Sequence, residues 1–240
     1  MKRGKRYRDA YARIDRERNY APRAAFQLLT DLNTAGFDPT VDVAFRLGVD
    51  PRQADQMVRG AVVLPHGTGA EATVVVVAAG EKAQEAKEAG ADHVGGDDLI
   101  ELLEQGDILA ELDAVIATPD QMSKLGRLGK LLGPRGLMPN PKSGTVTMDV
   151  GKAVSDVKAG KVEYRSDRQG NVHAILGRGS FTVDQLLDNF EALVDELVRQ
   201  RPAAAKGRYI RSVTISTTMG PGIRVDPAKS RDLIEEDEVA

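Results

Sequence analysis

The spacing of hydrophobic residues divides the chain into segments of different character. A basic, partly amphipathic stretch at 5–18 predicts a helix, and Pro22 begins a second helix with an apolar face that Gly36 ends. Apolar and polar residues then alternate over 41–47, which is the period of a half-buried strand, and a short apolar strand follows at 61–64. The N-terminal segment therefore predicts two helices followed by strands.

The pattern changes at Thr73, where the strands become apolar on both faces. A Val-rich strand, an Ala/Glu/Lys helix, a short apolar piece, an acidic helix and a further strand follow one another at 73–79, 81–88, 93–94, 97–104 and 114–117. Strands that are apolar on both faces and separated by helices are typical of a parallel sheet covered on both sides. This middle segment therefore predicts a βαβαβ unit.

Alternation returns towards the C-terminus. Apolar residues alternate at 162–164, a turn follows at 168–171, and alternation resumes over 172–176, which together predict a hairpin. A long amphipathic helix is expected over 183–197 and a last alternating strand over 209–215. The two outer segments of the chain thus share an antiparallel α+β character.

An insertion explains this order economically. Because single cores tend to settle at roughly 100–150 residues, we expect two domains. The first is a discontinuous antiparallel α+β domain of residues 1–67 plus 159–229, and the second is an inserted Rossmann-like, three-layer α/β domain of residues 68–158. The acidic tail at 230–240 is expected to be disordered. The chain passes between the two domains twice, and we expect these two crossings to form a hinge. The expected hinge residues are Pro65, His66, Gly67, Gly69 and Gly160.

Composition excludes several classes of protein. The chain has no cysteine, which rules out disulfides, thiolate zinc sites and cysteine nucleophiles, and we expect a cytoplasmic location. Aromatic residues make up only 4% and tryptophan is absent, which argues against a large aromatic ligand pocket. The longest apolar run, at 73–79, is far shorter than the roughly 20 residues that span a bilayer. We therefore expect no membrane segment.

The net charge of −3 hides a strongly uneven distribution. Residues 1–23 hold nine basic residues and three acids, a net charge of +6, whereas residues 81–113 hold two lysines and eleven acids, a net charge of −9. Five basic residues and no acid lie in 121–142, and eight basic residues and one acid lie in 199–231. A solvated surface explains any one such run. Three acid-poor basic segments together indicate a polyanionic partner.

Motifs of catalysis are missing. The glycine-rich segment 125–146 lacks the GxxxxGK[ST] spacing of a phosphate-binding loop, and the strand at 73–79 is followed by Gly80 without GxGxxG. The histidines show no metal-ligand spacing: His66, His93 and His173. We expect no enzyme, no cofactor and no metal, and interpret 125–146 as a flexible basic loop. A nucleotide-dependent enzyme built on the middle segment is the alternative, which a nucleotide titration would test.

Three segments taken together resemble the ribosomal L-one family of large-subunit stalk proteins. They are VRGAVVLPHGTG at 58–69, LGRLGKLLGPRGLMPNPKSGTV at 125–146 and STTMGPG at 216–222. Further similarity lies in KRYRDAYARIDRERNY at 5–20, FDPTVDVAFRLGVDPRQADQ at 37–56 and GRGSF at 177–181. The segments follow the family's order and spacing. The resemblance covers nearly the whole chain and spares only the acidic tail after about Asp226.

The resemblance implies which residues bind ribosomal RNA. They are Phe37, Thr40, Asp42, Arg165, Asp167, Ser212, Thr217, Thr218, Met219, Gly220 and Pro221. The sequence adds its own support, because STTMGPG ends a strand in hydroxyl groups that can read a ribose 2′-OH, although an ordinary strand-end turn has the same residues. The chain departs from the family at Gly36, where a basic residue is common, and at Pro39 and Asp42, where Glu is common. A phosphate contact is expected to be missing at position 36.

The resemblance also implies the function. It predicts a structural component of the large subunit that binds the stalk region of 23S-type rRNA, takes part in release of deacylated tRNA from the exit site, and represses translation of its own mRNA. The second domain is expected to face RNA and tRNA with Lys124, Arg127, Lys130, Arg135 and Lys142. Its partners would be these RNAs and other large-subunit components, and the free protein would be a monomer. An RNA-binding regulator that never enters the ribosome is the rival, separated by cosedimentation with large subunits.

Overall fold

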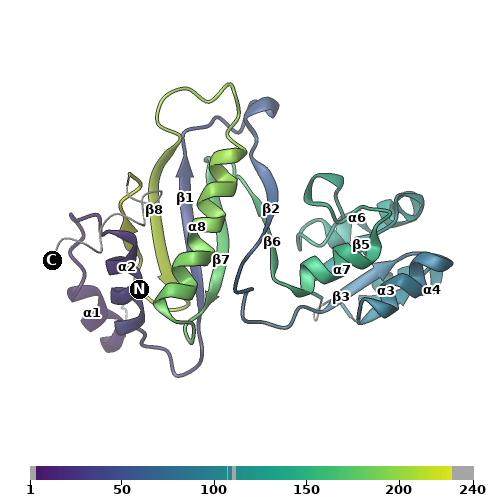
Figure 1. Cartoon of the computed structure of the whole chain (residues 1–240), viewed down its shortest axis with the longest axis horizontal. Coiled ribbons are helices and arrows are strands. Elements are labelled where there is room, and N and C mark those ends of the chain that lie inside the picture. The colour runs from purple at the N-terminus through teal and green to yellow at the C-terminus, as the bar shows by residue number, and fades with distance from the viewer. Residues whose placement is uncertain (1–3, 107, 110–111, 229–240) are drawn as a thin grey trace. The chain divides into compact units, whose positions relative to one another are not determined.

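The computed structural model describes residues 4–106, 108–109 and 112–228 (Figure 1). The chain forms two compact units. Unit 1 consists of the segments up to Gly69 and from Val162, and unit 2 is Ala70–Lys161. The acidic tail expected at 230–240 lies outside the described residues.

A four-stranded antiparallel sheet forms the centre of unit 1. Its strands lie in the order β7-β1-β8-β9, with bounds β1 Thr40–Leu47, β7 Asn171–Arg178, β8 Ile210–Thr217 and β9 Ile223–Val225. Its described helices are α1 Lys5–Ala12, α2 Pro22–Asp31, the short η1 Ala54–Gln56 and α8 Val183–Arg199. The alternation expected at 41–47 is confirmed, because alternate side chains of β1 are buried.

The core of unit 1 lies between this sheet and the helices α2 and α8. Phe26 of α2 and Phe45 of β1 both contact Phe190 of α8, with ring centroids 5.6 and 5.9 Å apart, and all three are fully buried. The hydroxyl of Thr182 accepts from the Gln185 N–H at 3.3 Å, and Gln185 Oε1 accepts from the Thr182 N–H at 2.9 Å, which fixes the start of α8. The sequence-predicted helix at 183–197 is confirmed.

The hairpin predicted around 168–171 forms only in part: its turn is present, closed by the bond from the Asp167 N–H to the Asn171 carbonyl at 2.7 Å, but its two strands belong to different sheets. Strand β6 (Lys161–Arg165) pairs with β2 (Arg59–Val63) in a separate two-stranded sheet, and it meets β7 only at the isolated bridge between Ser166 and Val172. Ser166 explains why β6 pairs with β2 and not with β7. Its N–H donates to the Val58 carbonyl at 2.8 Å and its hydroxyl accepts from the Val58 N–H at 3.2 Å, so the chain after β6 is held beside Val58.

The first predicted helix is shorter than expected, because α1 ends at Ala12 and not near Arg18. The chain beyond it is drawn to the edge of the sheet, where the Tyr20 N–H donates to the Arg224 carbonyl at 3.0 Å and the Tyr20 carbonyl accepts from Asp226 at 2.8 Å. These bonds hold the backbone of Tyr20 extended beside β9.

Unit 2 contains the expected parallel sheet. Its strands lie in the order β4-β3-β5, with bounds β3 Val74–Val77, β4 His93–Gly95 and β5 Ala114–Ala117. Val74 and Val76 pack into one core with the helices α3 (Glu81–Glu88) and α7 (Val150–Lys158), whereas Val75 and Val77 pack into a second core with α4 (Asp97–Gln105). The sheet is therefore covered on both faces.

The first part of the glycine-rich segment of unit 2 is helical, so the interpretation of 125–146 as a flexible loop is wrong for 125–132. Short turns follow one another at η2 Pro119–Gln121, α5 Met122–Leu125, η3 Gly126–Leu128, α6 Gly129–Leu132 and, further on, η4 Pro141–Ser143. Leu125, Leu128 and Leu132 are buried in the same core as Val75. Their spacing of three and four residues is that of a helix face, which the glycines obscured.

Candidate nucleic-acid interface

The end of the sheet where β1 begins and β8 ends brings together several of the expected RNA-binding residues. The Thr218 N–H donates to the Thr40 carbonyl at 2.9 Å, and the Thr218 hydroxyl donates to the same oxygen at 3.3 Å. The Arg178 Nη1 donates to the Thr40 hydroxyl at 3.4 Å. Because three strands contribute to these bonds, this rim holds its hydroxyl groups in fixed positions.

Two large apolar side chains are exposed at the sequence-predicted site. Met219 is 74% exposed and has φ of 71°, the left-handed region that side-chain-bearing residues seldom adopt. Phe37, just before β1, is 56% exposed. An exposed apolar residue in a strained backbone conformation gains nothing for folding, so it indicates a role in binding.

The loop that carries Phe37 is fixed by polar contacts with the end of β7. Asp38 accepts from the Ser180 N–H and from the Ser180 hydroxyl, each at 2.8 Å, and the Gly179 N–H donates to the Pro39 carbonyl at 2.7 Å. A Cβ at Gly179 would lie 2.8 Å from the Pro39 ring. Pro39, one of the departures from the family pattern, therefore packs into this loop.

The remaining members of STTMGPG are partly covered. Thr217 is 7% exposed and its side chain lies on the core side of β8, so only its backbone is available at the rim. The Gly220 N–H donates to the Thr217 carbonyl at 2.9 Å, and a Cβ on Gly220 would collide with the Thr217 hydroxyl oxygen. Glycine is thus required for this turn, which Pro221, itself buried, closes.

Asp42 and Ser212 lie on the face of the sheet opposite the core, which we call the open face. Here the side chains of β1 and β8 are partly or fully exposed. Sequence reasoning missed three neighbours on this face, Ala44, Thr214 and Ser216. The alternation of hydroxyl residues in β8 signals Thr214 and Ser216, whereas Ala44 has no such signal. Partial burial raises the pKa of the Asp42 carboxyl, and the nearby His173 opposes that rise. Small polar side chains let an RNA backbone approach the strands closely.

Arg165 and Asp167 lie near the other end of this sheet. Arg165 is exposed at the end of β6. The N–H groups of Gln169 and Asn171 each donate to Asp167 Oδ1 at 2.8 Å, and Asp167 Oδ2 lies 3.9 Å from His173 Nε2. Hydrogen bonds led by the Asn171 N–H keep the pKa of Asp167 below its usual value. Asp167 therefore shapes a turn, whereas Arg165 is open to a ligand.

The basic residues expected to face RNA in unit 2 differ in their surroundings. Lys124 donates to Asp97 at 2.5 Å, so its charge is partly neutralised. Arg127, Lys130 and Arg135 are exposed, and no salt bridge to them is found among the described residues. The side chain of Lys142 lies outside the described residues. Three open cations therefore remain on this surface.

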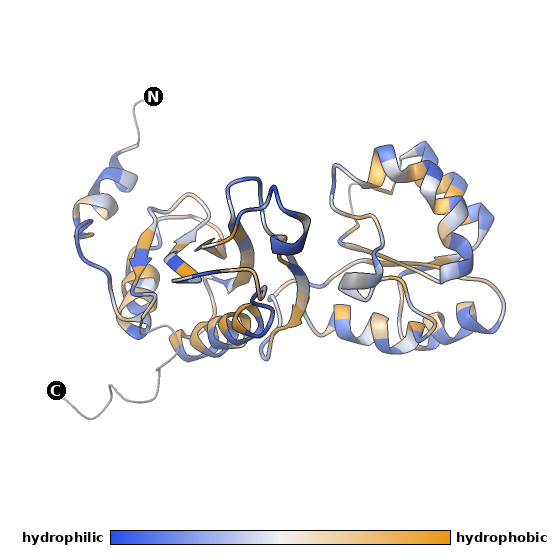
Figure 2. Ribbon diagram, turned by 90° about the horizontal axis from the view of Figure 1, so that it is seen from above, coloured by the Kyte–Doolittle hydropathy of each residue, from blue (hydrophilic) through white to orange (hydrophobic). Residues whose placement is uncertain are grey.

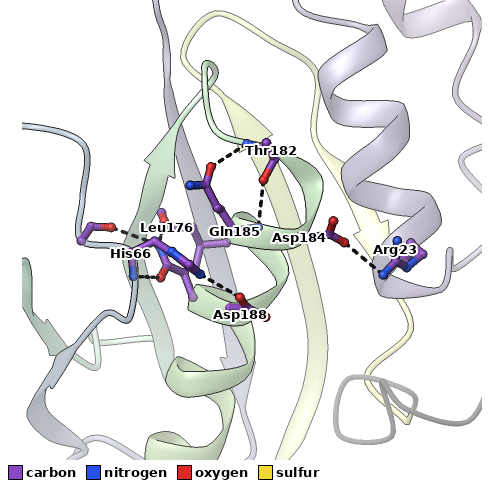
Figure 3. Close-up of polar contacts among 9 residues, drawn as sticks. Arg23, His66, Leu176, Thr182, Asp184, Gln185 and Asp188 are labelled. Atoms are coloured by element: carbon purple, nitrogen blue, oxygen red, sulfur yellow. Dashed lines mark hydrogen bonds and ion pairs between the residues drawn. The ribbon is translucent and has the colours of Figure 1, made fainter.

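The first crossing between the units is bound to α8 (Figure 3). The His66 N–H donates to Asn189 Oδ1 at 3.0 Å, and Asn189 Nδ2 donates to the Gly67 and Leu176 carbonyls at 3.0 and 2.7 Å. His66 Nε2 also lies 2.7 Å from Asp188. Asn189 is fully buried. Of the expected hinge residues, His66 and Gly67 are thus hydrogen-bonded to α8 of unit 1.

The other two expected hinge glycines have a left-handed backbone. Gly69 has φ of 73° and packs so closely on Arg178 and Phe181 that a Cβ there would lie 2.8 Å from each. Gly160, in the second crossing, has φ of 99°. Neither position accepts a larger residue without strain.

No group of three His, Cys, Asp or Glu side chains suited to a metal ion was found in the described part of the chain. Within the same ranges, no helix has the length and apolar character needed to cross a membrane.

Comparison with known proteins agrees with the motifs. The model of the ribosomal protein L1p/L10e family matches residues 29–221. A protein named large ribosomal subunit protein uL1 from Thermobifida fusca is 61% identical over 232 residues, which cover 97% of this chain and 98% of that protein. Proteins of the same name from a Streptomyces species and from Cutibacterium acnes are 58% and 56% identical, over 100% and 97% of this chain and 99% of each protein. The chain therefore belongs to the ribosomal protein L1p/L10e family.

Proposed function

We propose that this chain is a structural component of the large ribosomal subunit in the bacterial cytoplasm that binds the stalk region of 23S-type rRNA through unit 1. Its RNA surface consists of the rim of the sheet and the open face. The relatives are named as large-subunit proteins, and their similarity along the whole chain supports the same assembly here.

The observation that carries this proposal is the geometry of Met219. Its left-handed backbone presents an apolar side chain to solvent beside the Thr218 hydroxyl, at the end of a sheet whose open face has small polar side chains. A nucleotide offers an apolar base face and a sugar edge with a 2′-OH. An apolar contact beside hydroxyl and backbone groups matches both parts of that ligand.

We assign a separate role to unit 2. Its exposed cations Arg127, Lys130 and Arg135 would contact exit-site tRNA, and movement of unit 2 relative to unit 1 would accompany release of deacylated tRNA. Since residues 65–69 pack on unit 1, the pivot in the first crossing is expected after Gly69. In the second crossing it is expected at Gly160. The same RNA surface would bind a similar fold in the protein's own mRNA and repress its translation.

A shortened protein that consists of unit 1 alone tests the division into two domains. Residues 1–69 would be joined to the segment from Val162 by a short Gly/Ser linker, which keeps the contacts of His66 and Gly67 with Asn189. Because its core is separate from those of unit 2, this shortened protein should fold and keep most of the affinity for stalk RNA. Tight binding by unit 2 instead would reverse the assignment.

A footprint on large-subunit rRNA tests the function directly. The full chain should protect one stalk region and cosediment with large subunits. Protection without cosedimentation would favour the regulator that never enters the ribosome. Repression of the protein's own mRNA is tested by adding the chain to a translation reaction programmed with that mRNA, where synthesis should fall only if the messenger carries the same RNA fold.

A further inference from the structure

The N-terminal segment forms a second basic surface on unit 1. Between residues 4 and 20 the structure describes six exposed basic side chains and three acids, a net charge of +3. The basic residues are Lys5, Arg6, Arg8, Arg13, Arg16 and Arg18. None of the six is in a salt bridge within the described ranges. The family model begins at residue 29, so this basic segment lies outside the range that the model matches.

This segment is fixed at the β9 edge of the sheet. Tyr20 forms a bridge with Val225, and its hydroxyl accepts from the Asp15 N–H at 2.9 Å. Ala10 and Ile14 are buried in the core of unit 1. The ribbon of α1 is largely hydrophilic in Figure 2, consistent with anchoring by these few apolar residues. The arginines are therefore carried on backbone that is held in place.

Arg224 joins the basic segment to the open face. It pairs with Thr214 of β8, and its neighbours Ile223 and Val225 are buried, so its side chain emerges on the open face. Its Nη1 donates to the Arg16 carbonyl at 3.2 Å. The basic segment thus begins where the open face ends, and an RNA strand lying on β8 would reach it directly.

Aromatic rings support two of the arginines. The Arg16 guanidinium lies 5.3 Å from the centre of the Tyr11 ring, and Arg18 lies 5.5 Å from that of Tyr20. Tyr11 in turn stacks on Tyr7 at 5.9 Å. Such contacts restrict the guanidinium groups before a ligand arrives, which lowers the entropy lost on binding.

We propose that Arg13, Arg16, Arg18 and Arg224 form a phosphate-binding edge that extends the RNA surface of unit 1 past β9. The proposal rests on the proposed function, because the RNA on the open face supplies the phosphates. Contacts to phosphates do not distinguish one RNA base sequence from another. They add affinity that falls as the salt concentration rises. An acidic protein surface is the other class of partner for such a patch. Continuity with the open face through Arg224 favours RNA.

The test uses the full chain and a transcript of large-subunit rRNA that contains the stalk region. Arg13→Gln with Arg18→Gln removes two charges and keeps the contact between Arg16 and Arg224. Lys87→Gln with Lys152→Gln removes the same charge from exposed positions of unit 2 as the control. Affinities are measured at several salt concentrations, with thermal melts to verify folding.

The arginine variant should bind roughly three- to thirtyfold more weakly near 0.1 M salt, on the order expected for two exposed ion pairs. The slope of log affinity against log salt should fall by about 0.7–0.9 for each phosphate that the variant no longer binds. The lysine control should match wild type in both quantities. A larger effect at low salt than at high salt is expected, because screening removes such contacts.

Three results would overturn the phosphate-binding edge. They are an arginine variant that binds like wild type, an affinity loss with an unchanged salt slope, and an equal loss in the lysine control. Normal RNA binding with poor incorporation into large subunits would assign the patch to an acidic protein surface instead. If wild type does not bind the transcript, the proposed function fails, whereas wild-type affinity in both variants refutes only the edge.

Discussion

The hydroxyl of Thr218 and its N–H both donate to one acceptor, the carbonyl oxygen of Thr40, at 3.3 and 2.9 Å. These bonds join the end of β8 to the start of β1. With its proton directed at Thr40, the Thr218 hydroxyl turns its lone pairs outward. The exposed oxygen is therefore available as an acceptor for a ribose 2′-OH, which can donate as well as accept.

Thr218→Val should weaken RNA binding about tenfold or more. Valine is nearly isosteric and keeps the N–H bond to Thr40, but it leaves an RNA donor unpaired at a cost of roughly 1–3 kcal/mol. No charge is lost, so the salt slope should not change. Binding is measured at several salt concentrations, with Thr30→Val as control, since the Thr30 hydroxyl donates to the Gln27 carbonyl within α2 at 2.8 Å. A folded Thr218→Val that binds like wild type would remove this hydroxyl from the site.

Met219→Gly should separate stability from binding. Glycine adopts the φ of 71° without strain, so the melting temperature should stay the same or rise. RNA affinity should fall, because the exposed apolar side chain is gone. Met148→Gly is the control, since Met148 is also exposed but lies in unit 2. A parallel loss of stability and affinity in Met219→Gly would mean that the side chain supports the turn and does not contact RNA.

The sequence predicted the regular elements because each buries a periodic apolar face. Strand β1 and helix α8 follow such patterns, and β3 divides its valines between two cores. The alternation of Val213 and Ile215 also predicts that Thr217 faces the core, as the structure shows. Thr217 belongs to the expected site only through its place in the STTMGPG motif, and its buried side chain follows the strand pattern instead.

Other features depend on contacts between distant segments. The pairing of β6 with β2 follows from Ser166 and Val58, which are far apart in the sequence. The glycines at 126, 129 and 133 suggested a loop, although leucines between them pack on the sheet. The backbone of Met219 has no sequence signature, because left-handed conformations are expected at glycine or asparagine. The pairing of β6 with β2 thus depends on a long-range contact, whereas the helical turns and the Met219 backbone are local features without a clear sequence pattern.

Asn189→Leu should destabilise unit 1 by about 2–4 kcal/mol, because three backbone groups around the fully buried Asn189 lose their partner. The His66 N–H and the Gly67 and Leu176 carbonyls would be left unpaired. Chemical denaturation measures the loss. Asp188→Asn removes only the exposed contact to His66 and should cost less than about 1 kcal/mol. Equal effects of the two variants would contradict the role of Asn189 as the anchor of the crossing.

Asp92 should make unit 2 less stable in acid. The Val74 N–H donates to its carboxylate at 2.8 Å and Lys158 at 3.3 Å, and these bonds hold the pKa of Asp92 below its usual value. A lowered folded-state pKa adds stability above about pH 4 that is lost as pH falls through the folded value. The difference in unfolding free energy between wild type and Asp92→Asn should therefore shrink from pH 6 to pH 3.

The control for this pH effect is Asp120→Asn, which changes the same charge on an exposed side chain of unit 2. The difference in unfolding free energy between wild type and Asp120→Asn should vary less between pH 6 and pH 3. If the difference in unfolding free energy between wild type and Asp92→Asn stays constant with pH, the Asp92 carboxylate does not contribute the pH-dependent stability that a lowered pKa implies.

Lys130→Ala with Arg135→Ala should leave binding to isolated stalk RNA nearly unchanged and weaken tRNA binding on the ribosome. Both side chains are exposed on unit 2, whereas the rim and the open face belong to unit 1. Each cation removed from a phosphate reduces a salt-dependent attraction. Retention of deacylated tRNA in the exit site is measured on ribosomes assembled with each variant. Lys87→Ala with Lys152→Ala removes equal charge elsewhere on unit 2 and should retain tRNA like wild type. A loss of stalk-RNA affinity in the Lys130/Arg135 variant alone would place these side chains on the stalk and refute the division of roles between the units.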